Sequence, residues 1–201
     1  MKYWIKLIVC IYFIAIASLV YGEGNVTKSS GGNIKTELGY GIILNKESSL
    51  EREWITIHDN SFPADLLGTI GVKTIYESEG RYSSGGFRYK ANYTIKVLKP
   101  LSAIEIRFLT FDIWGDHIRN LSSTQIIDLK EGETHDFDGK WNVFGENEAS
   151  DYYASIAYIA QVRTKTGKVI KADPKTVIEE ARKFSAKFAE SDLESKPETK
   201  K

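Results

Sequence analysis

The longest regular pattern of apolar and polar positions runs from residue 87 to residue 97. Apolar side chains occupy every second position: Phe87, Tyr89, Ala91, Tyr93, Ile95 and Val97. The positions between them hold arginine, lysine, asparagine or threonine. Strict alternation of this kind is typical of a β-strand with one buried face. The pattern therefore predicts a long strand over residues 87–97.

A second long run, at residues 103–113, changes its alternation part-way along. Its apolar residues are Ile104, Ile106 and Phe108 at even positions, followed by Leu109, Phe111 and Ile113 at odd positions. Either a β-bulge near Phe108 turns the strand over, or the second half of the strand is buried on both faces. Both interpretations predict a strand that lies beside the first one.

Turn-forming residues separate several shorter strand patterns along the chain. These patterns lie at residues 54–58, 72–76, 121–129, 134–137, 141–144 and 168–172, and a third long strand is expected at residues 152–162. Many short strands at this spacing favour two packed sheets or a barrel. We therefore expect a mainly-β domain over residues 53–172, an antiparallel immunoglobulin-like β-sandwich, with a barrel as the alternative arrangement.

A helix is expected after the last strand. Asp173 and Pro174 form a capping residue followed by a proline suited to the first helical position. Apolar residues then recur at helical spacing: Val177, Ala181, Phe184 and Phe188. We expect one C-terminal α-helix over residues 173–193, whose apolar stripe either covers the sheet or binds a partner. Residues 194–201 are polar and predict a disordered tail.

The first 22 residues have the layout of a secretory signal peptide. Lys2 and Lys6 precede an apolar run that ends near Tyr21, and polar sequence follows Gly22. An uncleaved membrane anchor is the alternative, but a spanning helix needs about 20 apolar residues. We therefore expect a secreted or periplasmic protein with no stable membrane anchor after cleavage. Residues 23–52 are polar and rich in glycine and serine, which predicts a flexible leader.

The charge balance argues against a nucleic-acid partner. Lysine and arginine number 27 against 27 aspartate and glutamate, and loss of Lys2 and Lys6 with the signal peptide leaves 25 against 27, or −2. A near-neutral chain lacks the basic surplus of nucleic-acid-binding proteins.

The single cysteine, Cys10, lies in the signal peptide, so the exported protein would hold no disulfide.

One stretch resembles a known family. The segment FLTFD at residues 108–112, followed by Gly115, is similar to the core motif of FxLyD-type domains. The segment LKEG at residues 129–132, followed by Phe137, resembles their closing segment. The resemblance spans about residues 87–145 and implies an immunoglobulin-like sandwich of a bacterial exported protein. It implies no activity, because a fold does not fix a function.

No motif in the chain specifies a reaction. His58, His117 and His135 each adjoin an aspartate, but neighbours on a strand point to opposite faces. The spacings typical of metal ligands, phosphate loops and nucleophile elbows are not found. We therefore assign no catalytic, cofactor-binding or metal-binding residue, and we expect no cofactor. The alternative is an extracytoplasmic enzyme, such as a metal-dependent hydrolase, with its site at the loop ends.

We expect an exported, non-enzymatic module that binds a protein partner through one of two surfaces. The first is the turn that carries Trp114, Asp116 and His117, because loop ends of a rigid domain often hold recognition residues. The second is the C-terminal helix, with Phe184 and Phe188 as contact residues. For Trp114 the alternative is structural: its side chain would fold back and plug the end of the sandwich.

Overall fold

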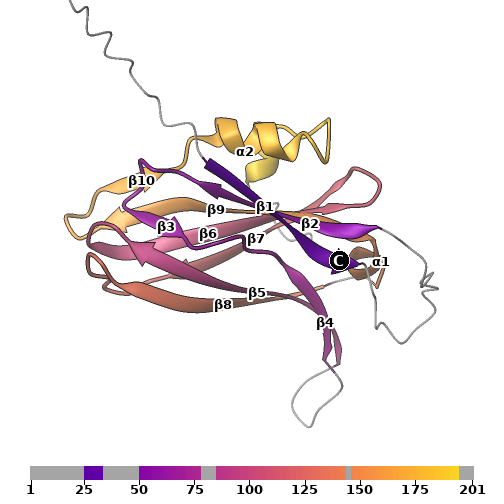
Figure 1. Ribbon diagram of the computed structural model, residues 1–201, viewed down its shortest axis with the longest axis horizontal. Helices are drawn as coiled ribbons and strands as arrows, with labels where there is room; N and C mark the ends of the chain where they lie inside the picture. The colour runs from indigo at the N-terminus through magenta and orange to yellow at the C-terminus, as the bar shows by residue number, and fades with distance from the viewer. Residues whose placement is uncertain (1–24, 34–49, 78–84, 144–145, 195–201) are drawn as a thin grey trace, which may run out of the picture.

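The computed structural model describes residues 25–33, 50–77, 85–143 and 146–194. In this part of the chain the strands form two sheets, and the helical elements are short (Figure 1). The elements are β1 (Asn25–Asn33), β2 (Glu51–His58), β3 (Ala64–Leu66), β4 (Lys73–Glu77), β5 (Gly86–Val97), β6 (Leu101–Asp112), β7 (His117–Gln125), β8 (Thr134–Asn142), α1 (Glu146–Asp151), β9 (Tyr152–Thr164), β10 (Val169–Lys171), α2 (Pro174–Ala181) and the 3-10 helix η1 (Glu190–Leu193). The predicted mainly-β class with a C-terminal α-helix is confirmed.

The six-stranded sheet has the order β1-β2-β9-β6-β7, with β10 also paired to β9. In the four-stranded sheet β5 is central, with β8 along one side and β3 and β4 along the other. The pairs are antiparallel except that β2 and β9 run parallel, over residues 53–56 and 154–157. The expectation of a purely antiparallel fold is therefore wrong at this pair. Turn signals specify only hairpins between neighbouring strands, and β2 and β9 are far apart in sequence.

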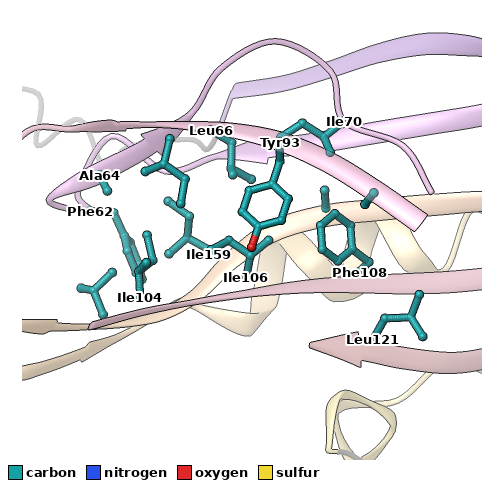
Figure 2. Close-up of a cluster of buried hydrophobic side chains, with 14 of the residues drawn as sticks. Phe62, Ala64, Leu66, Ile70, Tyr93, Ile104, Ile106, Phe108, Leu121 and Ile159 are labelled. Atoms are coloured by element: carbon teal, nitrogen blue, oxygen red, sulfur yellow. The ribbon is translucent and has the colours of Figure 1, made fainter. Parts of the chain in front are cut away.

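The inner core fills the space between the two sheets (Figure 2). Strands β5 and β6 were expected to lie beside each other, but they belong to different sheets and face each other across this core. Tyr93 of β5 and Phe108 of β6 meet across it, with their ring centroids 5.8 Å apart. The hydroxyl of Tyr93 donates a hydrogen bond to Oγ of Ser123, so the ring is buried without an unpaired polar atom. The alternating apolar residues of β5 are all buried, which confirms the strand predicted over residues 87–97.

Strand β6 is buried on both faces in its second half. Ile104, Ile106 and Phe108 belong to the inner core between the sheets. Leu109 and Phe111 instead belong to an outer cluster on the far face of the six-stranded sheet, together with side chains of α2. The change of alternation therefore reflects two buried faces, which confirms the second of the two interpretations.

Helix α2 begins as predicted and ends earlier than predicted. Oδ1 of Asp173 accepts a hydrogen bond of 2.9 Å from the backbone N–H of Lys175, which caps the helix. The helix ends at Ala181, so the expected helix over residues 173–193 is wrong beyond this point. The chain then turns back, and Nε of Arg182 donates to the carbonyl of Phe188 at 3.0 Å. This return buries Phe188 in the outer cluster. A helix that continued straight past Ala181 would carry Phe188 to a different position.

The expectation of a flexible leader over residues 23–52 is wrong for the part of this range that the structure describes. Residues 25–33 form β1, which pairs antiparallel with β2, and β2 itself begins at Glu51. Backbone hydrogen bonds of a sheet need no apolar side chains, so the polar composition did not reveal this strand. The expected signal peptide over residues 1–22 and most of the expected tail over residues 194–201 lie outside the described residues.

Two shorter strand predictions also need correction. The strand expected over residues 121–129 is β7, which ends at Gln125 and leaves the side chains of Ile126 and Ile127 exposed. The two strands expected over residues 134–137 and 141–144 form the single strand β8. Across the ranges that the structure describes, no helix has the length and apolar character needed to cross a membrane.

Candidate functional site

The turn between β6 and β7 is held rigid by the side chain of Asp112. Its Oδ1 accepts hydrogen bonds from the backbone N–H groups of Trp114 at 2.9 Å and of Asp116 at 2.8 Å. The backbone N–H of Asp112 donates to the carbonyl of Asp116 at 3.0 Å. Gly115 takes a φ of 86°, in the left-handed region that favours glycine. These bonds fix the direction in which the turn points its side chains.

Trp114 projects from this turn into solvent. Its exposed fraction is 74%, and the neighbouring Ile113 is 38% exposed. The structural alternative, in which Trp114 folds back as a plug, is therefore wrong. A large aromatic side chain held out by a fixed turn loses little conformational freedom when it binds, which favours a contact role.

An ion pair joins this turn to the C-terminal segment. The carboxylate of Asp116 pairs with the ammonium group of Lys187, and both side chains are mostly exposed. The hydrogen bond that the Lys187 ammonium group donates to Asp116 raises the pKa of Lys187 above its usual value. The backbone carbonyl of Phe184 also lies against Gly115. The two surfaces that the sequence proposed separately are therefore one surface, to which Lys187, not predicted from the sequence, contributes.

His117 is part of the packing beneath the turn. Its ring lies 5.5 Å from the ring of Phe111 and 5.0 Å from that of Phe188, measured between centroids. Its Nε2 lies 2.9 Å from the amide oxygen of Asn120, which can only accept, so Nε2 carries the proton. Asn120 in turn donates to the carbonyl of Asp192 at 2.7 Å. His117 thus links the sheet to the C-terminal segment.

Phe188 and Phe184 differ in exposure. Phe188 is 1% exposed and belongs to the outer cluster, so its predicted role as a contact residue is wrong. Phe184 is partly buried, and its ring packs on Phe111 at 5.4 Å and on Tyr153 at 6.2 Å. We call the exposed surface the Trp114 platform, which consists of Ile113, Trp114, Asp116, Phe184 and Lys187.

The three histidines do not converge. Each histidine contacts different polar groups: His58 contacts Thr27 and Asp65, His135 contacts Glu133, and His117 contacts Asn120. The described residues contain no group of three histidine, cysteine, aspartate or glutamate side chains arranged to hold a metal ion.

A small hollow of about 60 Å³ lies between the end of β2, β9 and the start of α2. Asp59 and Asp173 border it, but Oδ1 of each already accepts a hydrogen bond, from the backbone N–H of Ser61 and of Lys175 respectively. This volume suits a few water molecules rather than a sizeable ligand. The hollow does not add a ligand site to the platform.

No protein-family model matches the chain, and no curated protein matches it. Among solved structures, an X-ray structure of a hypothetical protein from Peptoclostridium difficile 630 is similar, with 10% sequence identity and a TM-score of 0.43. The match covers 67% of this chain and 98% of that chain. At this TM-score the likeness supports no conclusion about fold or function.

Proposed function

We propose that this chain is a non-enzymatic module that binds a protein partner through the Trp114 platform. The observation that carries the proposal is the 74% exposed side chain of Trp114 on a turn fixed by Asp112. Tryptophan is enriched among the residues that dominate the energy of protein interfaces. The ion pair between Asp116 and Lys187 lies beside it and fits the polar rim that surrounds such anchors.

The opposite end of the fold also displays apolar side chains. Ile126 is 86% exposed and Ile127 is 43% exposed, beyond the end of β7. Aliphatic residues contribute less often than tryptophan to interface hot spots. The Trp114 platform is therefore the preferred contact surface, and Ile126 serves as an exposed apolar control.

The test compares binding and stability in Trp114→Ala. Loss of a hot-spot side chain weakens an interface by about 2 kcal/mol or more. Removal of an exposed side chain changes the free energy of unfolding by less than about 0.5 kcal/mol. Affinity capture from the native host should therefore lose its partner with Trp114→Ala and keep it with Ile126→Ala. Equal capture by both variants would reject the platform.

Export belongs to the same proposal and rests on the pattern of residues 1–22. The resemblance to FxLyD-type domains, which are immunoglobulin-like sandwiches of bacterial exported proteins, supports this part of the proposal, and the pair of facing sheets is compatible with it. N-terminal sequencing of protein from the native host tests export directly. A chain that begins near Glu23 supports it, and an intact Met1 in the membrane fraction contradicts it.

A second candidate function is hydrolysis, favoured by one arrangement of side chains. Nε2 of His58 lies 2.9 Å from Oγ1 of Thr27, and its Nδ1 lies 2.9 Å from Oδ1 of Asp65. This order of nucleophile, base and orienting carboxylate is the one used in nucleophilic catalysis. It differs from the metal-dependent site at the loop ends that the sequence suggested.

Covalent labelling by a fluorophosphonate probe tests the hydrolase candidate. Labelling of the native protein that disappears in Thr27→Val, but persists in Thr134→Val at an exposed position of β8, would support it. The binding-module proposal expects no labelling of either protein.

A further inference from the structure

Three lysines lie directly opposite one another on the outer face of the four-stranded sheet. Lys90 of β5 pairs with Lys73 of β4 on one side and with Lys140 of β8 on the other. The neighbours of Lys90 in β5, Tyr89 and Ala91, point into the inner core, so the lysines are on the solvent side. We call this set the lysine row.

The lysine row is electrostatically unfavourable in the isolated fold. Adjacent strands lie about 4.8 Å apart, and like charges directly opposite each other destabilise a sheet. Arg88 stands two residues from Lys90 on the same face and adds a fourth cation. Glu77 supplies one carboxylate, with Oε1 at 2.9 Å from Nζ of Lys140 and Oε2 at 3.5 Å from Nε of Arg88. Four cations and one anion give this patch a net charge of +3.

The positive patch is narrow. Two residues along β8 from Lys140, Asp138 lies opposite Asn92, and Asp136 follows opposite Thr94. These carboxylates are on the same face as the lysine row and exposed. A broad anionic body, such as a membrane surface or a nucleic-acid duplex, would meet them as well as the lysines. A single polymer chain that lies across the strands would contact the lysine row alone.

The neighbouring groups also distinguish between kinds of polymer. Proteins that bind single-stranded nucleic acid stack bases on aromatic side chains. The outward-facing strand residues beside the lysine row are Ile75, Arg88, Asn92, Asp138 and Asn142, and none of these five is aromatic. The ring of Trp54 lies only at the margin of the row, beside Lys73. Asn92 and Asn142 have amide groups of the kind that hydrogen-bond hydroxyl groups.

We infer that the lysine row binds a linear acidic polysaccharide, whose carboxylate groups align with Lys73, Lys90 and Lys140 across the three strands. The ammonium group of Lys73 also lies 5.9 Å from the ring of Trp54, at the margin of the row. Binding would relieve the mutual repulsion of the lysines, which the single carboxylate of Glu77 compensates only in part. This surface is separate from the Trp114 platform and stands independently of the proposed protein partner.

The experiment is calorimetric titration of the full chain with polygalacturonate, with its methyl-esterified form as the uncharged control. We expect binding of the acidic form alone, weakening as salt is added. Lys90→Glu should weaken binding at least about fivefold, and Glu77→Gln should strengthen it roughly two- to fivefold by removing the competing carboxylate. Lys168→Glu, an exposed charge reversal on the β9–β10 turn, should leave binding unchanged.

The melting temperature distinguishes a binding role of Lys90 from a role in holding the fold together. Lys90→Glu places opposite charges beside Lys73 and Lys140, so its melting temperature should be equal to or above that of the native chain. Absence of binding to polygalacturonate, or equal weakening by Lys90→Glu and Lys168→Glu, would overturn the inference. Binding to an oligothymidylate or to anionic phospholipid vesicles in place of polygalacturonate would also overturn it.

Discussion

The imidazole ring of His117 lies edge-on to the ring of Phe188, with 5.0 Å between the ring centroids and 80° between the planes. Both residues are candidates for partner binding when only the sequence is considered. In the folded chain they contact each other, and they fasten the C-terminal segment to the six-stranded sheet. The exposed surface beside them consists of Trp114 and the other residues of the Trp114 platform.

This packing predicts that Phe188→Ala destabilises the fold. Phe188 is 1% exposed and its ring lies 5.8 Å from that of Phe111, so truncation leaves a cavity. The free energy of unfolding should fall by about 3 kcal/mol or more, measured by urea denaturation. Ile126→Ala, at a site 86% exposed, should change it by less than about 0.5 kcal/mol. Similar values for the two variants would contradict the assignment of Phe188 to the outer cluster.

The alternation of β5 makes a second prediction. Ile95 is fully buried in the inner core, so Ile95→Asp places an uncompensated charge between the sheets and should unfold the domain. Lys96 is exposed on the opposite face, so Lys96→Gln should leave the melting temperature nearly unchanged. Circular dichroism during heating distinguishes the two, and equal losses would mean that the faces of β5 are assigned wrongly.

The buried hydroxyl group of Tyr152 should make the fold less stable at alkaline pH. Burial raises the pKa of Tyr152 from 10.0 to about 12, because its charged form is disfavoured away from water. Its hydroxyl donates to the carbonyl of Val72 at 2.8 Å, a bond that requires the proton. The pKa of Tyr152 in the folded chain lies above its value in the unfolded chain. Its contribution to the free energy of unfolding is therefore complete below pH 10 and is lost as pH rises toward about 12.

Urea denaturation across this pH range measures the effect. Tyr152→Phe has no proton to lose at this position, so its stability should fall less steeply with pH than that of the native chain. Parallel curves for the two proteins would show that Tyr152 does not couple folding to pH.

The sequence pattern predicts the strands in which apolar and polar side chains alternate. It does not reveal the strands and contacts that are specified by backbone pairing. The strands around Tyr93 and Ile156 were predicted because burial of one or both faces shows directly in residue type. Strand β1 was missed because its polar residues pair through the backbone with β2. The parallel contact of β2 with β9 was missed for a related reason: no local signal specifies which distant strand a strand will join.

The candidate site was predicted in part. Trp114 and Asp116 were identified because a turn signal carries an aromatic and a charged residue together. Lys187 was not, since its proximity to Asp116 depends on where α2 ends and how the chain returns. The lysine row was also hidden, because cross-strand register is needed to align Lys73, Lys90 and Lys140.

Site-specific photo-crosslinking tests the central claim that the Trp114 platform is the binding surface. A photoreactive phenylalanine analogue at position 114 and, separately, at position 126 would be expressed in the native host and activated by light. Both positions are highly exposed and lie on different loops, so accessibility alone does not separate them. We expect a discrete crosslinked protein from position 114 and none from position 126. A crosslink from position 126 alone would contradict this claim.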